Sequence, residues 1–446
     1  MKAFIGKSTW LEEEEGHRLD ASTYASGGYE VRENIQHGVH WERLDKLANI
    51  FYGARFARNY VRDPERGVPF LSSSDMLLAD IRGVPFLSLE NTLPNLMKSL
   101  VIRFGWTLIS RSGTIGRTVF VRGEMDEMTA SEHVIRVVPE NPIVRPGYLF
   151  AFLTSVPAQA MIKQKTYGNV IQHIEPEHIA DLPVPIPDPE KQQRIHDLVV
   201  STAQARTEAN TLLKETAAYF DGLVGPMYSS HDHTRVAGII QYSHLNRRLD
   251  AFYHIGWAAE ACFDNGERID DLATVISTNR VPRIYVQHGI PFLSGIDIFQ
   301  VRPTARVHLA GYIADRFEAR VRGKDIAIQG SGQRYGLLGH PAYIGTRLDG
   351  WAASHDLFRI RAFNTDDTAR IYAFLRSDSG HRAMLRHSYG TSIPHVNPEG
   401  IASVRVPSLP PNYTVKAARA LQMIEQADAD EELAIREVEQ WVNSSH

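Results

Sequence analysis

Apolar and polar residues follow two patterns along this chain, and each pattern occurs in both halves. Short runs of branched and aromatic residues bounded by Gly, Ser or Asn predict β-strands, among them VPFLS, WTLIS, TVFVRG and HVIRVV. Two longer stretches, 146–166 and 370–388, carry apolar residues at helical spacing and predict helices. We therefore expect an α+β fold with an irregular sheet in each half.

The longest periodic pattern starts just after Pro187. Asp188 is a suitable helix cap and Pro189 suits the first helical position, so we expect a helix to begin here. Steps of three and four residues then alternate, which is typical of a coiled-coil seam. The seam positions are Ile195, Leu198, Thr202, Ala205, Ala209, Leu212, Thr216, Tyr219 and Leu223.

The end of the chain carries a matching but interrupted pattern. Its seam positions are Ala417, Leu421, Ile424, Ile435, Val438 and Val442. Two acidic residues, Asp428 and Glu431, interrupt the seam. We expect the two long helices to pair as an antiparallel coiled coil, because a duplicated chain places them at equivalent positions. Two unrelated surface helices are the alternative.

The chain contains an internal repeat. The stretch YGNVIQHIEPEHI (167–179) returns as YGTSIPHVNPEGI (389–401). Other matched blocks are ERLDKLANI with ERIDDLATV, GVPFLSSSDM with GIPFLSGIDI, and ASEHVIRV with ASHDLFRI. The separation of the matched blocks stays between 219 and 230 positions, which chance similarity does not maintain. We infer a tandem, pseudo-symmetric duplication of about residues 18–224 and 248–446, with a period too long for a solenoid.

The repeat and the two seams together predict five segments. Each half is a whole domain followed by a long helix, and a stretch rich in Gly, Ser and Pro joins the halves. The predicted segments are 1–187 (first domain), 188–224 (first helix), 225–247 (linker), 248–410 (second domain) and 411–446 (second helix).

Composition limits the class of protein. The 446 residues allow two to four domains at roughly 100–200 residues each. A net charge of −4 excludes a strongly basic tail but not local basic patches. The single cysteine, Cys262, excludes an intrachain disulfide and indicates a reducing compartment. Because no apolar signal core or membrane-length run occurs, we expect a cytoplasmic protein with no membrane partner.

Several catalytic and cofactor signatures are missing from the sequence. There is no GxxxxGK[ST] phosphate loop, and the Pro-Pro pair at 410–411 does not fit a base-methylating [DNS]PP[YFW] site. None of the lysines follows a carboxylate by two positions, as nuclease metal sites require. His173 and His178 are five residues apart, whereas helical metal pairs are usually four apart. We therefore expect no catalytic residues, no metal and no cofactor.

Two windows of the chain are locally basic. Residues 98–122 contain five basic and no acidic residues, and residues 302–347 contain eight basic and three acidic residues. Such windows favour contact with phosphates, and double-stranded DNA is the natural partner for a duplicated reader. A solvated charged face is the alternative interpretation.

Base recognition needs side chains with directed donors and acceptors. Arg suits guanine, and Gln and Asn suit adenine, while glycine lets a backbone approach DNA closely. The loop that differs between the two copies of the 167–179 stretch is a second source of readers. The candidates are Lys98, Arg103, Arg111, Ser112, Thr114, Arg117, Asn169, Gln172, His173, Arg322, Lys324, Gln329, Ser331, Gln333, Arg334, Tyr335, Thr391, Ser392 and His395. For Asn169, Gln172 and Thr391 a purely structural role is equally open.

These blocks together resemble a known family. WTLISRSGTIGRTVFV (106–121), YGNVIQHIEPEHIADLPVPIPDPEKQQRI (167–195) and the helix that follows look like the specificity subunit of a type I restriction-modification system. The resemblance covers nearly the whole chain, twice. It implies two target recognition domains that each read one half of an interrupted DNA sequence. It also implies that the paired helices act as a ruler, that two methyltransferase subunits dock, that motor-nuclease subunits join them, and that this chain is not itself catalytic.

Other functions stay open at the level of sequence. The chain could be a protein-binding scaffold or adaptor, or a DNA-targeting subunit of another defence or modification complex. A hydrolase is disfavoured, because neither half keeps a matched set of acid, base and nucleophile. Salt dependence separates a DNA reader from a scaffold, since several phosphate contacts make affinity fall steeply with ionic strength.

Overall fold

The computed structural model describes residues 7, 8, 10, 21–90, 92, 94–165, 173–224, 248–249, 251–254, 263 and 265–444. The predicted linker 225–247, Cys262 and the candidate readers Asn169 and Gln172 lie outside the described residues. The chain divides into two compact units. Unit 1 comprises Met1–Thr207 and Gln426–His446, and unit 2 comprises Glu208–Glu425.

A four-stranded antiparallel sheet forms the centre of unit 1. Its strand order is β2-β9-β6-β7. The strands are β2 (Ala48–Tyr52), β9 (Val134–Pro139), β6 (Thr107–Ser110) and β7 (Thr118–Phe120). Successive side chains of a strand point to opposite faces. Ile109 and Ile135 accordingly join one apolar core, and Leu108 and Val134 join another. Burial on both faces explains why these strands read as continuous apolar runs.

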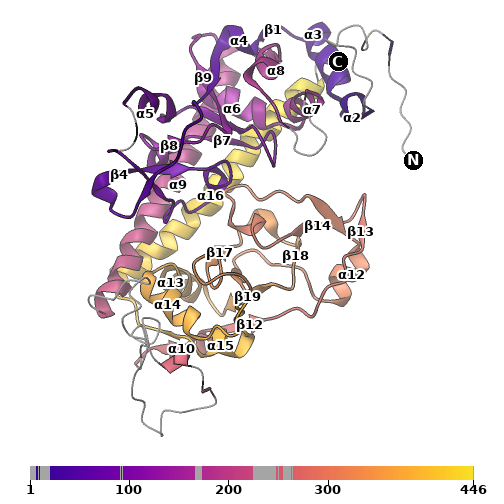
Figure 1. Cartoon of the computed structure of the whole chain (residues 1–446). Coiled ribbons are helices and arrows are strands. Elements are labelled where there is room, and N and C mark those ends of the chain that lie inside the picture. The colour runs from indigo at the N-terminus through magenta and orange to yellow at the C-terminus, as the bar shows by residue number, and fades with distance from the viewer. Residues whose placement is uncertain are drawn as a thin grey trace. The chain divides into compact units, whose positions relative to one another are not determined.

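Helices cover one face of this sheet. The helices α6 (Pro146–Thr154) and α7 (Val156–Gln164) follow β9, and α6 contacts β6, β7 and β9 (Figure 1). Ser155 separates the two helices and caps the second, because its side chain accepts a hydrogen bond from the Ala158 N–H. The predicted helix 146–166 is therefore two helices with a cap between them.

Two smaller sheets complete the strands of unit 1. The order β3-β5-β4-β8 places β3 at an edge and pairs β4 with β8 in parallel. The remaining pair, β1 with β10, is antiparallel. These strands are β1 (Trp41–Arg43), β3 (Tyr60–Val61), β4 (Gly67–Leu71), β5 (Phe86–Ser88), β8 (Thr129–Ala130) and β10 (Pro183–Pro185). The shorter helices described in unit 1 are α2 (Ala21–Tyr24), α3 (Gly28–Gly38), α4 (Leu44–Leu47), α5 (Pro94–Leu100) and α8 (Pro176–Ala180).

Unit 2 has the same three sheets with the same connections. The orders are β12-β19-β16-β17, β13-β15-β14-β18 and β11-β20, and β14 and β18 form the parallel pair. The strands are β11 (Glu267–Arg268), β12 (Ala273–Ile276), β13 (Tyr285–Val286), β14 (Ile290–Leu293), β15 (Val307–Leu309), β16 (Ile326–Gln329), β17 (Pro341–Tyr343), β18 (Ala352–Ala353), β19 (Leu357–Ala362) and β20 (Arg405–Val406). The shorter helices described in this unit are α10 (Ala251–His254), α11 (Ile269–Leu272), α12 (Gly311–Arg316), α13 (Thr365–Leu375), α14 (Asp378–Arg386) and α15 (Pro398–Ser403). The predicted α+β class is confirmed.

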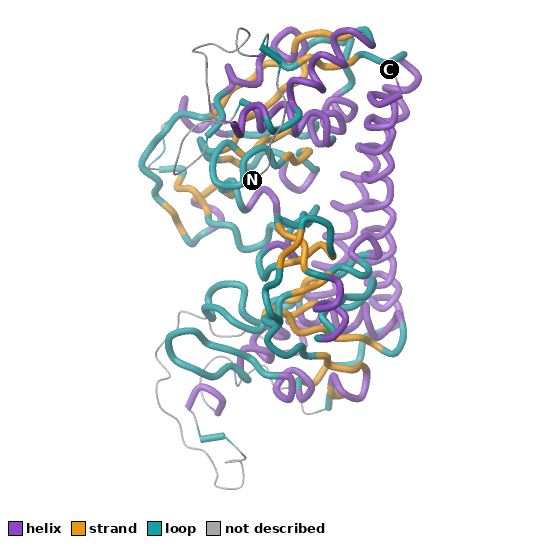
Figure 2. The backbone as a smooth tube through the Cα atoms, turned by 90° about the vertical axis from the view of Figure 1, so that its right-hand side faces the viewer, coloured by secondary structure: helices purple, strands orange, loops and turns teal. Residues whose placement is uncertain are grey.

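Two long helices contribute to the cores of both units. They are α9 (Pro189–Val224) and α16 (Pro411–Ser444). The expected cap of α9 is present, since the Lys191 N–H donates to Asp188 Oδ1 at 2.8 Å. In unit 1 the core includes Ile195 and Val199 of α9 with Ile435 and Val438 of α16. In unit 2 it includes Ala209, Leu213 and Phe220 of α9 with Ala417 and Leu421 of α16. Within each unit, the stretches of α9 and α16 that belong to it lie side by side (Figure 2).

The buried stripe of α9 differs in part from the seam read off the sequence. Ile195, Thr202, Ala209 and Thr216 are buried as predicted. Leu223, the last predicted seam position, is 48% exposed. At the remaining four seam positions the buried residue is one place later in the chain. The later residues are Val199, Arg206, Leu213 and Phe220, in place of Leu198, Ala205, Leu212 and Tyr219. A heptad pattern restricts the buried face, but a helix that packs on a sheet domain as well as on a helix buries a wider stripe.

The polar interruption of the second seam is resolved by a buried ion cluster in unit 1. Arg206 Nη2 lies 2.8 Å from Asp428 Oδ1, and Arg206 Nη1 lies 3.0 Å from Glu431 Oε1. Burial acts to lower the pKa of Arg206, but the two carboxylates outweigh it and raise that pKa. The arginine was missed as a seam position because a charged residue does not count toward an apolar pattern.

Within the described part of the chain, no helix is both long enough and apolar enough to cross a membrane.

Candidate nucleic-acid interface

In unit 1 the structure joins two of the segments that carry the sequence motifs. The turn between β6 and β7 meets the segment before α8 through a bridge between Ser112 and His173. The Ile174 N–H also donates to the Arg111 carbonyl at 3.1 Å. Gly113 at the tip of the turn is exposed and has a φ of 75°, a conformation that glycine adopts without steric cost.

In unit 2 the corresponding segments are joined in the same way. Ser331, in the loop after β16, bridges to His395, and the Gly332 N–H donates to the Pro394 carbonyl at 3.1 Å. Gln333 Nε2 donates to the Ser392 carbonyl at 3.1 Å. The structure thus brings together candidate readers that lie about sixty residues apart in the sequence: Ser331, Gln333, Ser392 and His395.

The tips of the two loops in unit 2 are exposed. Tyr335 is 91% exposed and Ile393 is 59% exposed, which is unusual for side chains of this size. Thr391 and Ser392 are exposed as well. Arg334 is half-buried, because its guanidinium lies 4.0 Å from the Phe252 ring centroid and its Nε donates to Ser388 Oγ at 2.8 Å. Exposed aromatic groups beside backbone amides can stack on bases or contact sugars.

Arg111 occupies a different kind of position from the exposed tips. It is 5% exposed and its guanidinium donates two hydrogen bonds to the Glu175 carboxylate. The same group lies 4.4 Å from the Tyr52 ring centroid. In this conformation Arg111 ties the β6–β7 turn to the start of α8. Thr114 and Arg117, also candidate readers, are half-buried in the same turn.

The other basic candidates lie outside these loops, on α5 and on connecting segments. Lys98 is exposed on α5, and Arg103 is exposed but lies 2.6 Å from Glu127 through its Nη1. Arg322 and Lys324 are exposed in the turn before β16, where Lys324 has a φ of 74°. Gln329 ends β16, and its Nε2 donates to the Ser331 carbonyl at 2.8 Å. These positions place positive charge on the surfaces of both units.

Sequence reasoning missed a charged cluster next to the Ser112 bridge. Ser112 Oγ lies 3.1 Å from His133 Nδ1, and Arg58 Nη2 lies 2.8 Å from Glu132 Oε1. Partial burial lowers the pKa of His133, and the guanidinium groups of Arg58, Arg111 and Arg55 lower it further against the effect of Glu132. The sequence could have indicated this position, because the matched blocks ASEHVIRV and ASHDLFRI align His133 with Asp356, two different polar residues in otherwise similar surroundings.

Two buried arginines in the same matched blocks were also missed. Arg136 of β9 is fully buried and donates to the carbonyls of Leu100, Ala130, Ser131 and Val134. Burial lowers the pKa of Arg136 to about 10. Arg359 of β19 occupies the equivalent position in unit 2 and donates to the carbonyls of Glu318 and Arg320. Both residues hold the loops behind the central sheet and are not available to a ligand.

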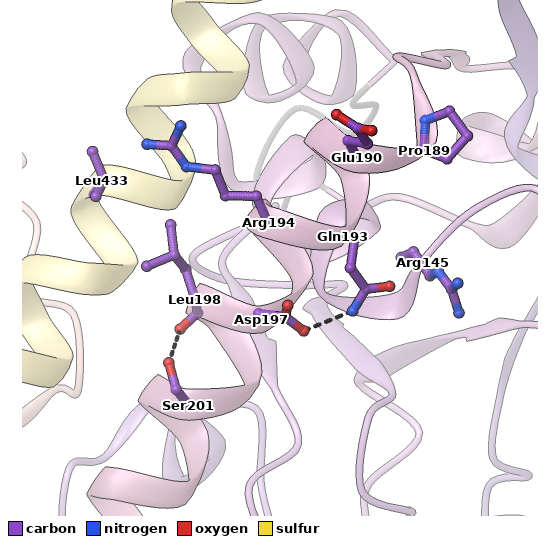
Figure 3. A pocket seen from close by; sticks show the side chains of 9 residues that line it. All are labelled: Arg145, Pro189, Glu190, Gln193, Arg194, Asp197, Leu198, Ser201 and Leu433. Atoms are coloured by element: carbon purple, nitrogen blue, oxygen red, sulfur yellow. Dashed lines mark hydrogen bonds between the residues drawn. The ribbon is translucent and has the colours of Figure 1, made fainter.

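A hollow of about 880 Å³ lies along the first turns of α9 in unit 1 (Figure 3). Its lining residues are Arg145, Pro189, Glu190, Gln193, Arg194, Asp197, Leu198, Ser201 and Leu433. Gln193 Nε2 donates to Asp197 Oδ1 at 2.7 Å, and Ser201 Oγ donates to the Leu198 carbonyl at 3.0 Å. These charges are mixed, and the lining contains no arrangement of nucleophile and base.

No cluster of three or more His, Cys, Asp or Glu side chains is placed to hold a metal ion within the residues described by the structure.

Comparison with known proteins gives one family and several similar structures. Residues 39–214 match the family described as the type I restriction modification DNA specificity domain. The chain is similar to the S subunit of the type I restriction-modification system from M. genitalium, with 11% identity, 92% of this chain and 96% of that chain covered, and a TM-score of 0.33. It is also similar to the HsdS subunit from Thermoanaerobacter tengcongensis, with 14% identity, 92% and 96% covered, and a TM-score of 0.28. A comparison with curated protein sequences found no match.

Proposed function

Since residues 39–214 match the family of type I restriction-modification DNA specificity domains, we propose that this chain is the DNA sequence-recognition subunit of a type I restriction-modification complex. Each unit reads one half of a bipartite, interrupted target in double-stranded DNA. The family is generally non-catalytic, and this chain neither methylates nor cuts DNA itself. It docks two methyltransferase subunits, which the motor-nuclease subunits join.

One observation carries the proposal of two readers. The bridge between Ser112 and His173 in unit 1 recurs as the bridge between Ser331 and His395 in unit 2. The frame of the loop pair is therefore the same in both units, while the side chains on it differ. A constant frame with changed side chains is what two different half-sites require, because the frame sets the approach and the side chains select the base.

The proposed contacts fall into two classes. Lys98, Arg103, Arg322 and Lys324 contact phosphates, since they are cations exposed on the surface. The loop residues select bases or contact sugars. They are Ser112, Thr114, Arg117 and His173 in unit 1, and Gln329, Ser331, Gln333, Arg334, Tyr335, Thr391, Ser392 and His395 in unit 2. Asn169 and Gln172 join the first set as predictions from sequence. Arg111 acts in this scheme by positioning the turn through Glu175.

The long helices are proposed to set the gap between the half-sites as an antiparallel coiled coil. Contacts inside each unit support opposite directions. In unit 1 Arg194 lies 2.6 Å from Glu437, and Thr202 donates to the Ala427 carbonyl at 3.2 Å. In unit 2 Glu208 lies 2.6 Å from Arg419, and the Tyr219 and Tyr413 ring centroids are 4.7 Å apart. As the residue numbers along α9 increase, the residue numbers of the contacting positions on α16 decrease, as expected of antiparallel helices. The 36 residues of α9 correspond to about 54 Å of helix.

Selection from a random duplex library tests the proposal. The complex of this chain with its methyltransferase subunits is expected to enrich two short words separated by a fixed number of unspecified base pairs. Affinity should fall steeply as salt rises, because phosphate contacts release counterions. Methyltransferase subunits without this chain are the control. A selected pool with no two-part motif would contradict the proposal.

Shortening both helices tests the ruler. Removing one heptad from each of α9 and α16 shortens the pair by about 10 Å, or roughly three base pairs of DNA. The gap between the two words is expected to shrink while the words stay unchanged. Removing a heptad from α9 alone is the matched control, because it destroys the pairing register and should abolish selection. An unchanged gap in the double deletion would refute the ruler.

A further inference from the structure

In each unit, two loops are joined by a bridge, between Ser112 and His173 in unit 1 and between Ser331 and His395 in unit 2. The serine of each bridge also contacts a further side chain, and this side chain differs between the units. In unit 1 the bridging residue Ser112 contacts His133, and the distance between Ser112 Oγ and His133 Nδ1 is 3.1 Å. In unit 2 the equivalent residue Ser331 donates from Oγ to Asp356 Oδ1, also at 3.1 Å. The same position therefore carries an imidazole in one unit and a carboxylate in the other.

Strand register makes the two positions equivalent. Ser110 of β6 is paired with Val134 of β9, and Gln329 of β16 is paired with Leu357 of β19. His133 and Asp356 each come one residue before the paired strand begins. A backbone hydrogen bond repeats the match, since the Arg111 N–H donates to the His133 carbonyl at 3.0 Å and the Gly330 N–H donates to the Asp356 carbonyl at 2.7 Å.

Both side chains keep surface exposed beside the loop tips. The side chain of His133 is 37% exposed and that of Asp356 is 35% exposed. One nitrogen of His133 contacts Ser112, and the other lies 3.6 Å from Glu132 Oε1. The Asp356 oxygens accept from Ser331 and, at 3.3 Å, from Ser354 Oγ. Each oxygen keeps a lone pair, because a carboxylate has about four acceptor sites in all.

The two positions differ in the hydrogen-bonding groups that they offer. Partial burial lowers the pKa of the His133 ring, and the guanidinium groups of Arg58, Arg111 and Arg55 lower it further against the effect of Glu132, which favours the neutral ring. When the Ser112 hydroxyl donates to Nδ1, the proton is on Nε2, and His133 is a hydrogen-bond donor. Asp356 is an acceptor only. Unit 1 thus offers a donor where unit 2 offers an acceptor.

We propose that His133 and Asp356 are specificity-determining residues, each selecting the base at one position of its own half-site. The donor His133 selects a base that presents an acceptor in the major groove, which is N7 of a purine, O6 of guanine or O4 of thymine, against cytosine, which presents a donor there. The acceptor Asp356 selects an exocyclic amino group, which is N4 of cytosine or N6 of adenine. Ser112 and Ser331 hold these side chains in place. This inference rests on the proposed function, because it needs two independently read half-sites.

The test repeats the library selection with complexes that carry His133→Ala or Asp356→Asn. Asn keeps an acceptor for Ser331 but adds an amide donor. The variant Asp356→Asn is expected to change the preferred base at one position of one word by about fivefold or more, and to leave the other word unchanged. His133→Ala is expected to relax one position of the other word by a similar factor. His37→Ala on α3 and Asp366→Asn on α13, both exposed, are matched controls that should leave both words unchanged.

The outcomes separate the inference from the function it rests on. If the wild-type complex selects no two-part motif, the proposed function fails. If the wild type selects such a motif and both variants keep every base preference, the inference alone is wrong. Thermal unfolding of each variant shows that it is folded. His133→Gln and Asp356→Glu, which keep a hydrogen-bonding group for the serine, carry the same test if either first variant does not fold.

Discussion

The two units share a frame and differ in how charge is placed on it. Each has the same three sheets, the same bridge between its loops and a buried arginine on the second strand of its central sheet, β9 in unit 1 and β19 in unit 2. Around that frame, the Ser112 position meets a histidine among arginines, and the Ser331 position meets an aspartate. The backbone pairing is thus the same in both units, whereas the charged side chains at its edges differ, which agrees with the proposal that each unit reads its own half-site.

The stretches of the long helices in the two units also differ in where their charged residues lie. In unit 1 the stretch buries Arg206 between Asp428 and Glu431. In unit 2 the ion pairs Lys416–Glu215 and Arg419–Glu208 lie on the surface. A buried charged cluster specifies alignment, because any other register leaves a charge buried without a partner. Surface pairs impose little such restriction.

The largest effect is expected from breaking the buried cluster. Arg206→Ala leaves two carboxylates buried without their partner, so we expect the free energy of unfolding to fall by about 3–5 kcal/mol. Arg419→Ala is the matched control, because Arg419 of α16 forms an exposed ion pair with Glu208 of α9. This variant should leave the free energy of unfolding nearly unchanged. Urea unfolding with hydrogen exchange at α9 measures both. Equal losses would remove the distinction between the two stretches.

Acid is expected to destabilise unit 2 through His387, a residue whose equivalent in unit 1 is not a histidine. Burial, with the positive charge of Arg386, lowers the pKa of His387 to about 4, whereas the repeat places Lys165 at that position in unit 1. The unfolded chain binds a proton near the ordinary histidine pKa of about 6.5, and the folded unit does so only near 4. Stability is therefore lost as pH falls from about 6.5 to about 4, by up to about 3 kcal/mol.

Unfolding measured between pH 7 and pH 4 checks this expectation against a variant. His387→Gln should remove this part of the pH dependence, while His288→Gln, at an exposed site of the same unit, should keep it. Subtracting the two profiles removes the contribution of carboxylates that titrate in the same range. Identical profiles for the two variants would show that His387 is protonated in the folded unit.

Removing the buried arginine of each central sheet is expected to lower the free energy of unfolding by a smaller amount, and by different amounts in the two units. Arg136→Met leaves four carbonyl groups without their donor, and we expect a loss of about 2–3 kcal/mol. Arg359→Met affects two carbonyl groups and the Thr278 hydroxyl, and the expected loss is about 1–2 kcal/mol. Thermal unfolding with hydrogen exchange in β9 and β19 compares the two. A larger loss for Arg359 would reverse the order argued here.

The smallest effect on stability is expected at the exposed tip of unit 2. Tyr335→Ala removes a side chain that is 91% exposed, so unfolding should be unchanged. If the ring contacts a base or sugar, affinity for the selected duplex should fall by about fivefold or more. Binding curves at one fixed salt concentration measure this loss. Ile296→Ala, at another exposed apolar residue of the unit, is the control, and equal binding by all three proteins would exclude Tyr335 from the interface.

The sequence by itself determined the elements and their duplication. Periodicity predicted the helix that begins at Pro189, because the steps of three and four residues and the cap at Asp188 are local properties. The matched blocks predicted two similar halves of α+β class, since a constant separation is visible without coordinates. The candidate loops around Ser112 and Ser331 were also identified from these local signals.

Only the tertiary structure decided which side chains meet. The contact of Ser112 with His133 depends on the register of β6 against β9, and the pairing of Arg111 with Glu175 depends on where α8 begins. The partners of Arg206 are more than two hundred residues away along the chain. A pattern of apolar positions restricts the face that an element buries, but it carries no information about the polar partner across that face. Hydrogen bonds and ion pairs are directional and short, so their partners are set by packing.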